Sequence, residues 1–134
     1  MPLIKDTVDF VIEGWSFGHT VIDNFNQLEK TVNQLVSNCA SILNDDGAMI
    51  FIETLGSNVN APCAPTAELN AFYTELETAH GFKKTILKTD YKFQNYEEAY
   101  RVFSFFFGPA MAENIKANKL AIIPEYTGVW IRGK

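Results

Sequence analysis

The sequence lacks the features that mark several classes of protein. Its eleven lysine and arginine residues are scattered, and the only adjacent pair is Lys83-Lys84, in a chain of formal net charge −5. Because binding to nucleic-acid phosphates requires a clustered basic face, we expect no nucleic-acid partner. No apolar run approaches the roughly 20 residues needed to cross a membrane. No basic segment followed by an apolar stretch marks a secretion signal either.

Cysteine and histidine are also sparse, and the glycines are widely spaced. Cys39 and Cys63 have no CxxC spacing, and His19 and His80 have no metal-ligand spacing. We therefore expect reduced thiols, no metal site and a cytoplasmic location. None of the eight glycines lies two residues from another. This spacing excludes a GxGxxG fingerprint, and neither a phosphate loop nor a GxSxG elbow is present.

The most informative stretch is Val8 to Thr20, VDFVIEGWSFGHT. Its first half is a dense apolar run, which is typical of an inner strand covered on both faces. The run stops at Glu13-Gly14, and a short loop follows that carries a Trp, a Ser, a Gly and a His. Ligands bind at the carboxyl ends of strands in open α/β sheets. This loop is therefore the best candidate site in the sequence.

The other periodicities predict the order β-α-β-α-β-α-α-β, an α/β layer protein with a mainly parallel sheet. Residues 1–134 form one domain in this interpretation. The individual expectations are a helix opening at Asn24 with a capping-box partner at Gln27 and ending in the turn Asn44–Gly47, a strand Ala48–Leu55, a helix from Thr66 to His80-Gly81, a strand Phe82–Phe93, a helix capped by Asn95 and Glu98, a helix Ala110–Ala117, and a last strand Leu120–Ile131.

Two of these segments carry more specific expectations. Strict alternation in Phe82–Phe93 puts a mostly charged set opposite a fairly apolar set, which indicates a strand with one wet face near a sheet edge. The helix Tyr96–Phe107 is rich in aromatic residues. A small-ligand site is one interpretation of these aromatics, but core packing explains them better.

The two histidines have ordinary structural explanations. His80 lies in the last turn of its predicted helix, where a histidine complements the helix dipole. His19 is the residue whose bare chemistry suggests function, but a loop histidine bonded to nearby backbone is the favoured reading from chemistry alone.

The segment Met1 to Thr20, MPLIKDTVDFVIEGWSFGHT, resembles the stretch around the fourth strand of class I S-adenosylmethionine-dependent methyltransferases. An apolar-Pro pair, an Asp before an apolar strand, and a loop with small, aromatic and His residues match in order. GAMIFIETLG then resembles the fifth strand of the family. A helix closing at His80-Gly81-Phe82 leads to a sixth, and a last antiparallel strand contains Pro124, Glu125, Thr127 and Trp130.

The resemblance covers nearly the whole chain but only the carboxyl-terminal half of the family's partial Rossmann-like sheet. The first three strands are missing, with the glycine-rich loop and the acidic residue that hold the cofactor. The resemblance implies that Gly14, Trp15 and Ser16 line S-adenosylmethionine, and that His19 lies on the substrate side. It implies no catalytic residue, no methyl acceptor, and little activity for the isolated chain.

Two functions follow as hypotheses. The chain is the carboxyl-terminal portion of a methyltransferase whose amino-terminal half is missing or supplied by another polypeptide. Alternatively, it is a non-catalytic association module. In both cases the first strand has a bare hydrogen-bonding edge, and such edges pair with other strands. We therefore expect a homodimer or larger homo-oligomer formed through Val8–Ile12 or through exchanged elements.

Overall fold

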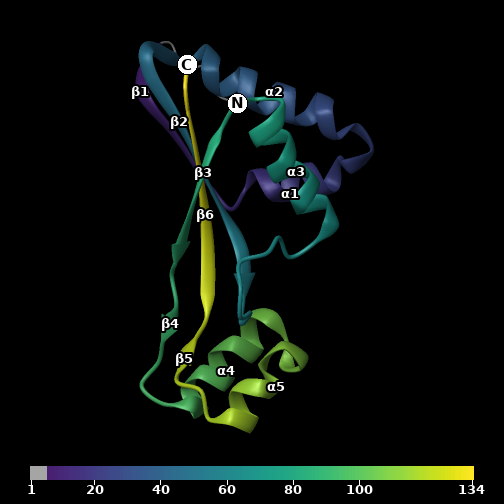
Figure 1. The fold of residues 1–134 in the computed structure, drawn as a ribbon, viewed down its shortest axis with the longest axis vertical. Helices are drawn as coiled ribbons and strands as arrows, with labels where there is room; N and C mark the ends of the chain where they lie inside the picture. Colours follow the sequence, from purple (N-terminus) through teal and green to yellow (C-terminus); the bar gives the residue numbers. More distant parts are fainter. Residues whose placement is uncertain (1–5) are drawn as a thin grey trace.

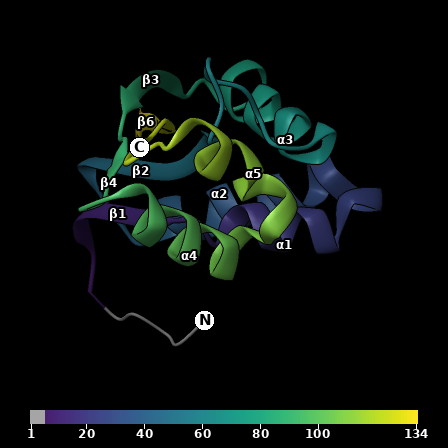
Figure 2. The same ribbon diagram turned by 90° about the horizontal axis from the view of Figure 1, so that it is seen from below.

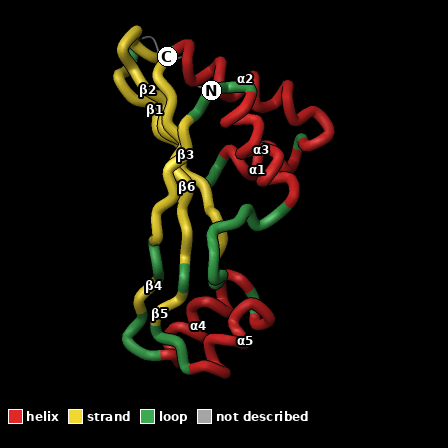
Figure 3. The backbone as a smooth tube through the Cα atoms, in the orientation of Figure 1, coloured by secondary structure: helices red, strands yellow, loops and turns green. Residues whose placement is uncertain are grey.

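The computed structural model describes residues 6–134 and shows an α/β fold with a mixed sheet (Figure 1). Met1 and Pro2, which carry part of the family resemblance, lie outside the described residues. Helices and strands alternate along most of the chain (Figure 3). The helices are α1 (Phe17–Asp23), the 3-10 turn η1 (Phe25–Gln27), α2 (Leu28–Ser41), α3 (Ala67–Thr78), α4 (Tyr96–Phe107) and α5 (Pro109–Asn118). The strands are β1 (Val8–Gly14), β2 (Leu43–Ser57), β3 (Lys83–Lys88), β4 (Tyr91–Lys92), β5 (Ile122–Ile123) and β6 (Glu125–Gly133).

The main sheet has the strand order β1-β2-β6-β3. β1 and β2 are parallel, and β6 is antiparallel to both β2 and β3. The expected antiparallel last strand is therefore confirmed. Among the four described strands of this mixed sheet, β1, β2 and β3 run in one direction and β6, inserted between β2 and β3, runs in the other, which agrees with the expected sheet of mainly parallel strands.

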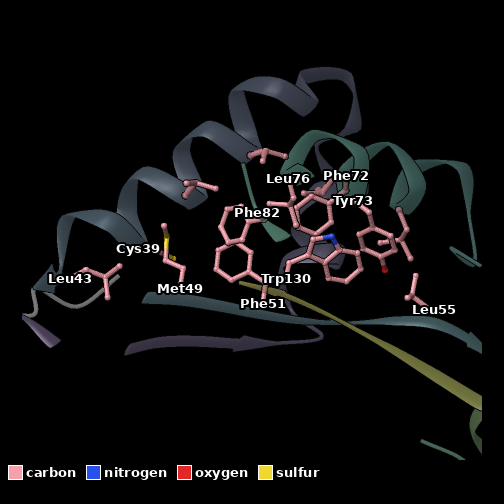
Figure 4. Packing of buried hydrophobic residues seen from close by; sticks show 14 residues of the cluster. Cys39, Leu43, Met49, Phe51, Leu55, Phe72, Tyr73, Leu76, Phe82 and Trp130 are labelled. Atoms are coloured by element: carbon pink, nitrogen blue, oxygen red, sulfur yellow. The ribbon is translucent and has the colours of Figure 1, made fainter. Parts of the chain in front are cut away.

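The hydrophobic core lies between one face of this sheet and the helices α1, α2 and α3 (Figure 4). Trp130 and Phe51 are fully buried at its centre. The Phe51 ring lies 5.1 Å from the ring of Phe17 and 4.8 Å from that of Phe82, and Trp130 lies 4.5 Å from Tyr73. Aromatic residues from four elements thus join the helix layer to the sheet.

The opposite face of the sheet, which we call the open face, carries none of the described helices (Figure 1). The prediction that the first strand is covered on both faces is wrong for this part of the chain. β1 is a terminal strand, and Phe10 and Ile12 are 63% and 64% exposed. Apolar composition marks faces that favour burial, but it does not say where the cover comes from. By register, the open face carries Phe10, Ile12, Ala48, Ile50, Ile52, Lys83, Thr85, Leu87, Thr127, Val129 and Ile131.

The segment after β1 is helical, which adds a helix to the predicted order. The expected loop at residues 17–20 belongs to α1, and the helix predicted from Asn24 begins at Leu28. Neither Asn24 nor Gln27 makes a side-chain capping bond. The sequence suggests a loop residue at Gly18, but in the structure Gly18 belongs to α1 and allows this helix to approach α3 closely.

The predicted turn Asn44–Gly47 is part of β2 instead. The register between β1 and β2 passes from Val8 opposite Leu43 to Phe10 opposite Ala48, so these residues form a bulge in the strand. Asn44 Nδ2 donates to Asp9 Oδ1 at 2.7 Å across the bulge. Residues that favour turns can serve a bulge equally well, because both need irregular backbone.

The third and last predicted strands are both divided. β3 is an edge strand, as expected, but it ends at Lys88, and its continuation β4 pairs with β5 in a second, two-stranded sheet. Pro124 separates β5 from β6. The helices α4 and α5 pack beside this small sheet around a core of their own. No helix in the described part of the chain is long and apolar enough to cross a membrane.

Candidate functional site

The loop between β1 and α1 lies at the carboxyl end of β1, facing the end of the molecule that carries the α4–α5 hairpin. Figure 2 views the molecule from this end. Trp15 has a left-handed backbone conformation, with φ of 56°, and its N–H donates to the carbonyl of Ile52 at 2.9 Å. This bond ties the loop to β2 although the strand itself has ended.

The side chain of Glu13 holds the loop between β1 and α1 in place through hydrogen bonds. This side chain is 6% exposed, and Oε1 accepts hydrogen bonds from the backbone N–H of Ser16 at 2.6 Å, the hydroxyl of Ser16 at 2.9 Å and the N–H of Phe17 at 2.9 Å. These N–H groups begin α1 and have no partner inside the helix. A carboxylate at a helix N-terminus also complements the helix dipole. Glu13 therefore fixes where α1 begins.

Glu53 anchors the same helix from the neighbouring strand. Glu13 lies opposite Phe51 in the register, so Glu53 is the diagonal neighbour of Glu13 on the same face of the sheet. Glu53 is 3% exposed and its Oε1 accepts the N–H of Gly18 at 2.8 Å. Burial, with a smaller contribution from the charge of Glu13, raises the pKa of Glu53 to about 7. At neutral pH the Glu53 carboxyl group is therefore about half protonated.

Gly18 makes this contact possible because it has no side chain. A Cβ at position 18 would lie 2.9 Å from Leu69 Cδ2 and 3.0 Å from Glu53 Oε2. The small residue therefore lets α1 rest directly on α3 and on the buried carboxyl group.

The structure brings the residues of the predicted site together but gives them different environments. Gly14 ends β1 with open space on its side-chain side, since a Cβ there would meet no atom within 4 Å. Trp15 is 56% exposed. Trp15 and His19 share a small pocket of about 100 Å³ with Glu53. The hydroxyl of Ser16 is instead committed to Glu13.

The sequence interpretation missed the buried polar groups that hold this region. Glu53 was available as a signal, because it is a charged residue within the apolar run AMIFIETL. Tyr73 is a second missed residue: its hydroxyl donates to the carbonyl of Thr54 at 2.9 Å, and burial, followed by the charges of Glu53 and Glu13, raises its pKa. The second oxygen of Glu13 is buried with no hydrogen-bond partner among residues 6–134.

This arrangement offers an exposed surface for binding, and its carboxyl groups serve structural roles. Trp15 and His19 present an exposed indole and an imidazole, while the carboxyl groups of Glu13 and Glu53 are turned inward as anchors. Within the described residues, no three His, Cys, Asp or Glu side chains lie together as a metal site would require. Cys39 and Cys63 are free thiols, the first buried and the second exposed.

Comparison with known proteins adds no identification. No protein-family model matches the chain, and a search of curated proteins found no match.

Proposed function

We propose that this chain is the carboxyl-terminal portion of an S-adenosylmethionine-dependent methyltransferase, and that it is nearly inactive until a second segment completes the cofactor site. Methyl transfer depends largely on holding the acceptor in line with the methyl group, so an incomplete site loses most of the rate. The sequence resemblance is the origin of the proposal. The antiparallel last strand and the loop at the carboxyl end of β1 agree with it.

The observation that carries the proposal is the incompleteness of the sheet on the β1 side. Among the described strands, β1 pairs with β2 alone, so its outer edge presents unpaired backbone groups. Phe10 and Ile12 beside this edge are more than half exposed. The resemblance puts the missing cofactor-binding half on this side. An absent half of a larger sheet would leave both features.

The loop residues fit a flat ligand. Gly14 has open space beside it, and the exposed Trp15 indole offers an apolar surface for an adenine or sulfonium group. His19 lies beside Trp15, on the side proposed for the acceptor. Ser16 contributes through the backbone of the loop, because its hydroxyl already bonds to Glu13. The cofactor itself supplies the activated methyl group.

Calorimetric titration with S-adenosylhomocysteine, together with Trp15 fluorescence, tests the proposal. We expect a dissociation constant at or below about 1 mM, equivalent to about −4 kcal/mol. Gly14→Val should abolish this binding, because the added side chain fills the open space without meeting other atoms of the protein. Gly133→Val is the matched control, since that exposed glycine ends β6 at the opposite end of the sheet. No binding at millimolar ligand, or equal binding by both variants, would refute the cofactor site.

The alternative proposal is a non-catalytic association module that self-assembles through Val8–Ile12. The same bare edge favours it, because an exposed apolar strand is a template for pairing. Analytical ultracentrifugation of the wild type should show a dimer or larger oligomer, and Ile12→Lys should give a monomer. Ile86→Lys is the control, since Ile86 is a 47% exposed isoleucine on the other edge strand, β3. A monodisperse wild-type monomer contradicts self-association. In an oligomer, the unfolding midpoint should rise with protein concentration.

A further inference from the structure

Beside the α4–α5 hairpin is a cavity whose walls, contributed by α4, β4 and Phe93, are apolar or aromatic. Its volume is about 310 Å³, at the lower end of the range typical of small-molecule sites. It lies between β4 and α4, away from the Trp15 loop. The lining residues are Tyr91, Phe93, Val102, Phe103, Phe106 and Phe107.

Folding alone does not account for these aromatic residues. The core of the hairpin consists of Phe103 and four aliphatic side chains, and Phe103 is 2% exposed. By contrast, Phe105 and Phe106 are 81% and 71% exposed, and Phe107 is 40% exposed. The sequence-based expectation that core packing explains the aromatics of α4 is therefore wrong for these three. Exposed clusters of aromatic side chains mark binding sites more often than ordinary solvent-facing surface.

The walls of the cavity are held in place before any ligand arrives. The rings of Phe103 and Phe107 lie 4.3 Å apart, and Tyr91 meets Phe103 edge to face at 6.4 Å. α4 then ends at Gly108, which has φ of 86°, and Pro109 begins α5. This sharp end fixes the last turn of α4, which carries Phe106 and Phe107. A preformed wall lowers the entropic cost of binding.

The hairpin is also tied to the main sheet. Asn58, just beyond β2, donates through Nδ2 to the carbonyl of Met111 at 2.7 Å and to Asn114 Oδ1 at 2.6 Å. Asn114 returns a bond to Asn58 Oδ1 at 3.0 Å. The cavity therefore belongs to a fixed part of the fold.

We propose that this cavity binds a small uncharged ring compound of one or two fused rings. No charged side chain lines the cavity, so nothing there compensates the desolvation of a charged ligand. Its size admits a small molecule, whereas a stable protein partner needs about 800 Å² of surface on each side. The exposed rings of Tyr91, Phe106 and Phe107 favour a planar aromatic ligand, which stacks against them. This site is independent of the proposed methyltransferase function.

Titration with the uncharged fluorophore N-phenyl-1-naphthylamine tests the site. We expect saturable binding of one probe per chain. Val102→Phe, which fills the cavity, and Phe106→Ala, which removes a wall, should each weaken binding about tenfold. Phe105→Ala is the matched control, because Phe105 is the adjacent and more exposed aromatic of the same helix but does not line the cavity. We expect its affinity to stay within about twofold of wild type.

Val102→Phe fills the cavity and Phe106→Ala removes part of its wall, so a folding defect in one variant leaves the other informative. Urea unfolding identifies the variants that fold. Non-saturable binding contradicts the site. So does a loss in Phe105→Ala equal to that in Phe106→Ala, because the probe would then adsorb to exposed aromatics. Sedimentation with phosphatidylcholine vesicles gives a further outcome. Vesicle binding that Phe105→Ala abolishes, without saturable probe binding, would assign the aromatics to a lipid surface and overturn the proposal.

Discussion

Replacing Glu53 by glutamine should remove a pH dependence from the stability of the protein. Glu53 is buried and its Oε1 accepts the N–H of Gly18, a bond that the amide oxygen of glutamine can also accept. Burial and the charge of Glu13 raise its pKa from the ordinary 4.5 to about 7. Glutamine carries no charge at any pH, so the substitution removes the titration while keeping the shape and the acceptor.

The sign of the effect follows from the two protonation states. Below pH 4.5 the carboxyl group is protonated in the folded and the unfolded chain alike. Between pH 4.5 and about 7 the unfolded chain loses its proton while the folded chain keeps it, so the free energy of unfolding falls as pH rises. One pKa unit corresponds to about 1.4 kcal/mol, so the loss reaches about 3 kcal/mol above this window. That is a large share of a typical stability of about 5–15 kcal/mol.

Urea unfolding at a series of pH values measures this difference, with the emission of buried Trp130 as the signal. The indole N–H of Trp130 donates to Glu77 at 3.1 Å, so unfolding changes its surroundings. The stability of Glu53→Gln relative to wild type should increase by about 3 kcal/mol between pH 4 and pH 8. Glu29→Gln, at an exposed position of α2, should run parallel to wild type. Parallel curves for Glu53→Gln and wild type would refute the raised pKa.

Three further predictions concern single residues. Gly18→Ala should destabilise the protein by about 1–3 kcal/mol in urea unfolding, because the new methyl group overlaps Leu69; a neutral result contradicts the close packing. Ellman's reagent at pH 8 should modify Cys63 rapidly and spare Cys39, whose pKa burial raises to about 11; equal rates would show that Cys39 is accessible. Tyr73→Phe removes the hydroxyl that bonds to the backbone of β2 and should cost about 1–3 kcal/mol in thermal unfolding, and an unchanged midpoint would mean that water replaces it.

Local signals in the sequence were sufficient for the elements whose cause is local. Thr66 caps α3 by accepting the N–H of Leu69 at 3.2 Å, and Asn95 caps α4 by accepting the N–H of Glu98 at 2.9 Å, as their spacing predicts. Caps depend on four consecutive residues, so the sequence contains all that is needed. The start of α1 depends instead on Glu13 and on contacts with β2 and α3, which no local pattern reports.

The alternation in β3 shows a different kind of limit. The sequence correctly predicts an edge position, but it expects one wet face, whereas all six residues of β3 are exposed. In the structure Lys84 is on the helix side, where it forms an ion pair with Glu77 at 2.9 Å and lies 5.8 Å from the ring of Trp130. Leu87, from the more apolar set, is on the open face. Periodicity separates the faces of a strand, but only the tertiary partners decide which side of the sheet each face lies on.

The candidate site divides in the same way. The sequence predicts the end of β1 and the exposed Trp15 that follows it, because the end of an apolar strand is a local event, but His19, which it expects in a loop, lies in α1. The carboxyl pair beneath it depends on the register that puts Glu13 opposite Phe51, and so brings Glu53 within range. Register arises from pairing between distant segments, and a one-residue slip would turn these side chains to the other face. Whether an acidic residue of an apolar strand is buried therefore depends on how that strand pairs with its neighbours.

The open face joins these observations into one argument about association. Phe10, Ile12, Leu87 and Ile131 are each between 43% and 64% exposed on it. Removing the exposed part of such a side chain from water is worth roughly 1–2 kcal/mol, so covering four of them is worth roughly 4–8 kcal/mol. This is comparable to the stability of a whole domain, about 5–15 kcal/mol. On β3, Lys84 and Lys88 lie on the helix side, whereas Leu87 and Thr85 lie on the open side together with Lys83. The mostly apolar pattern of this face therefore fits a protein cover better than solvent.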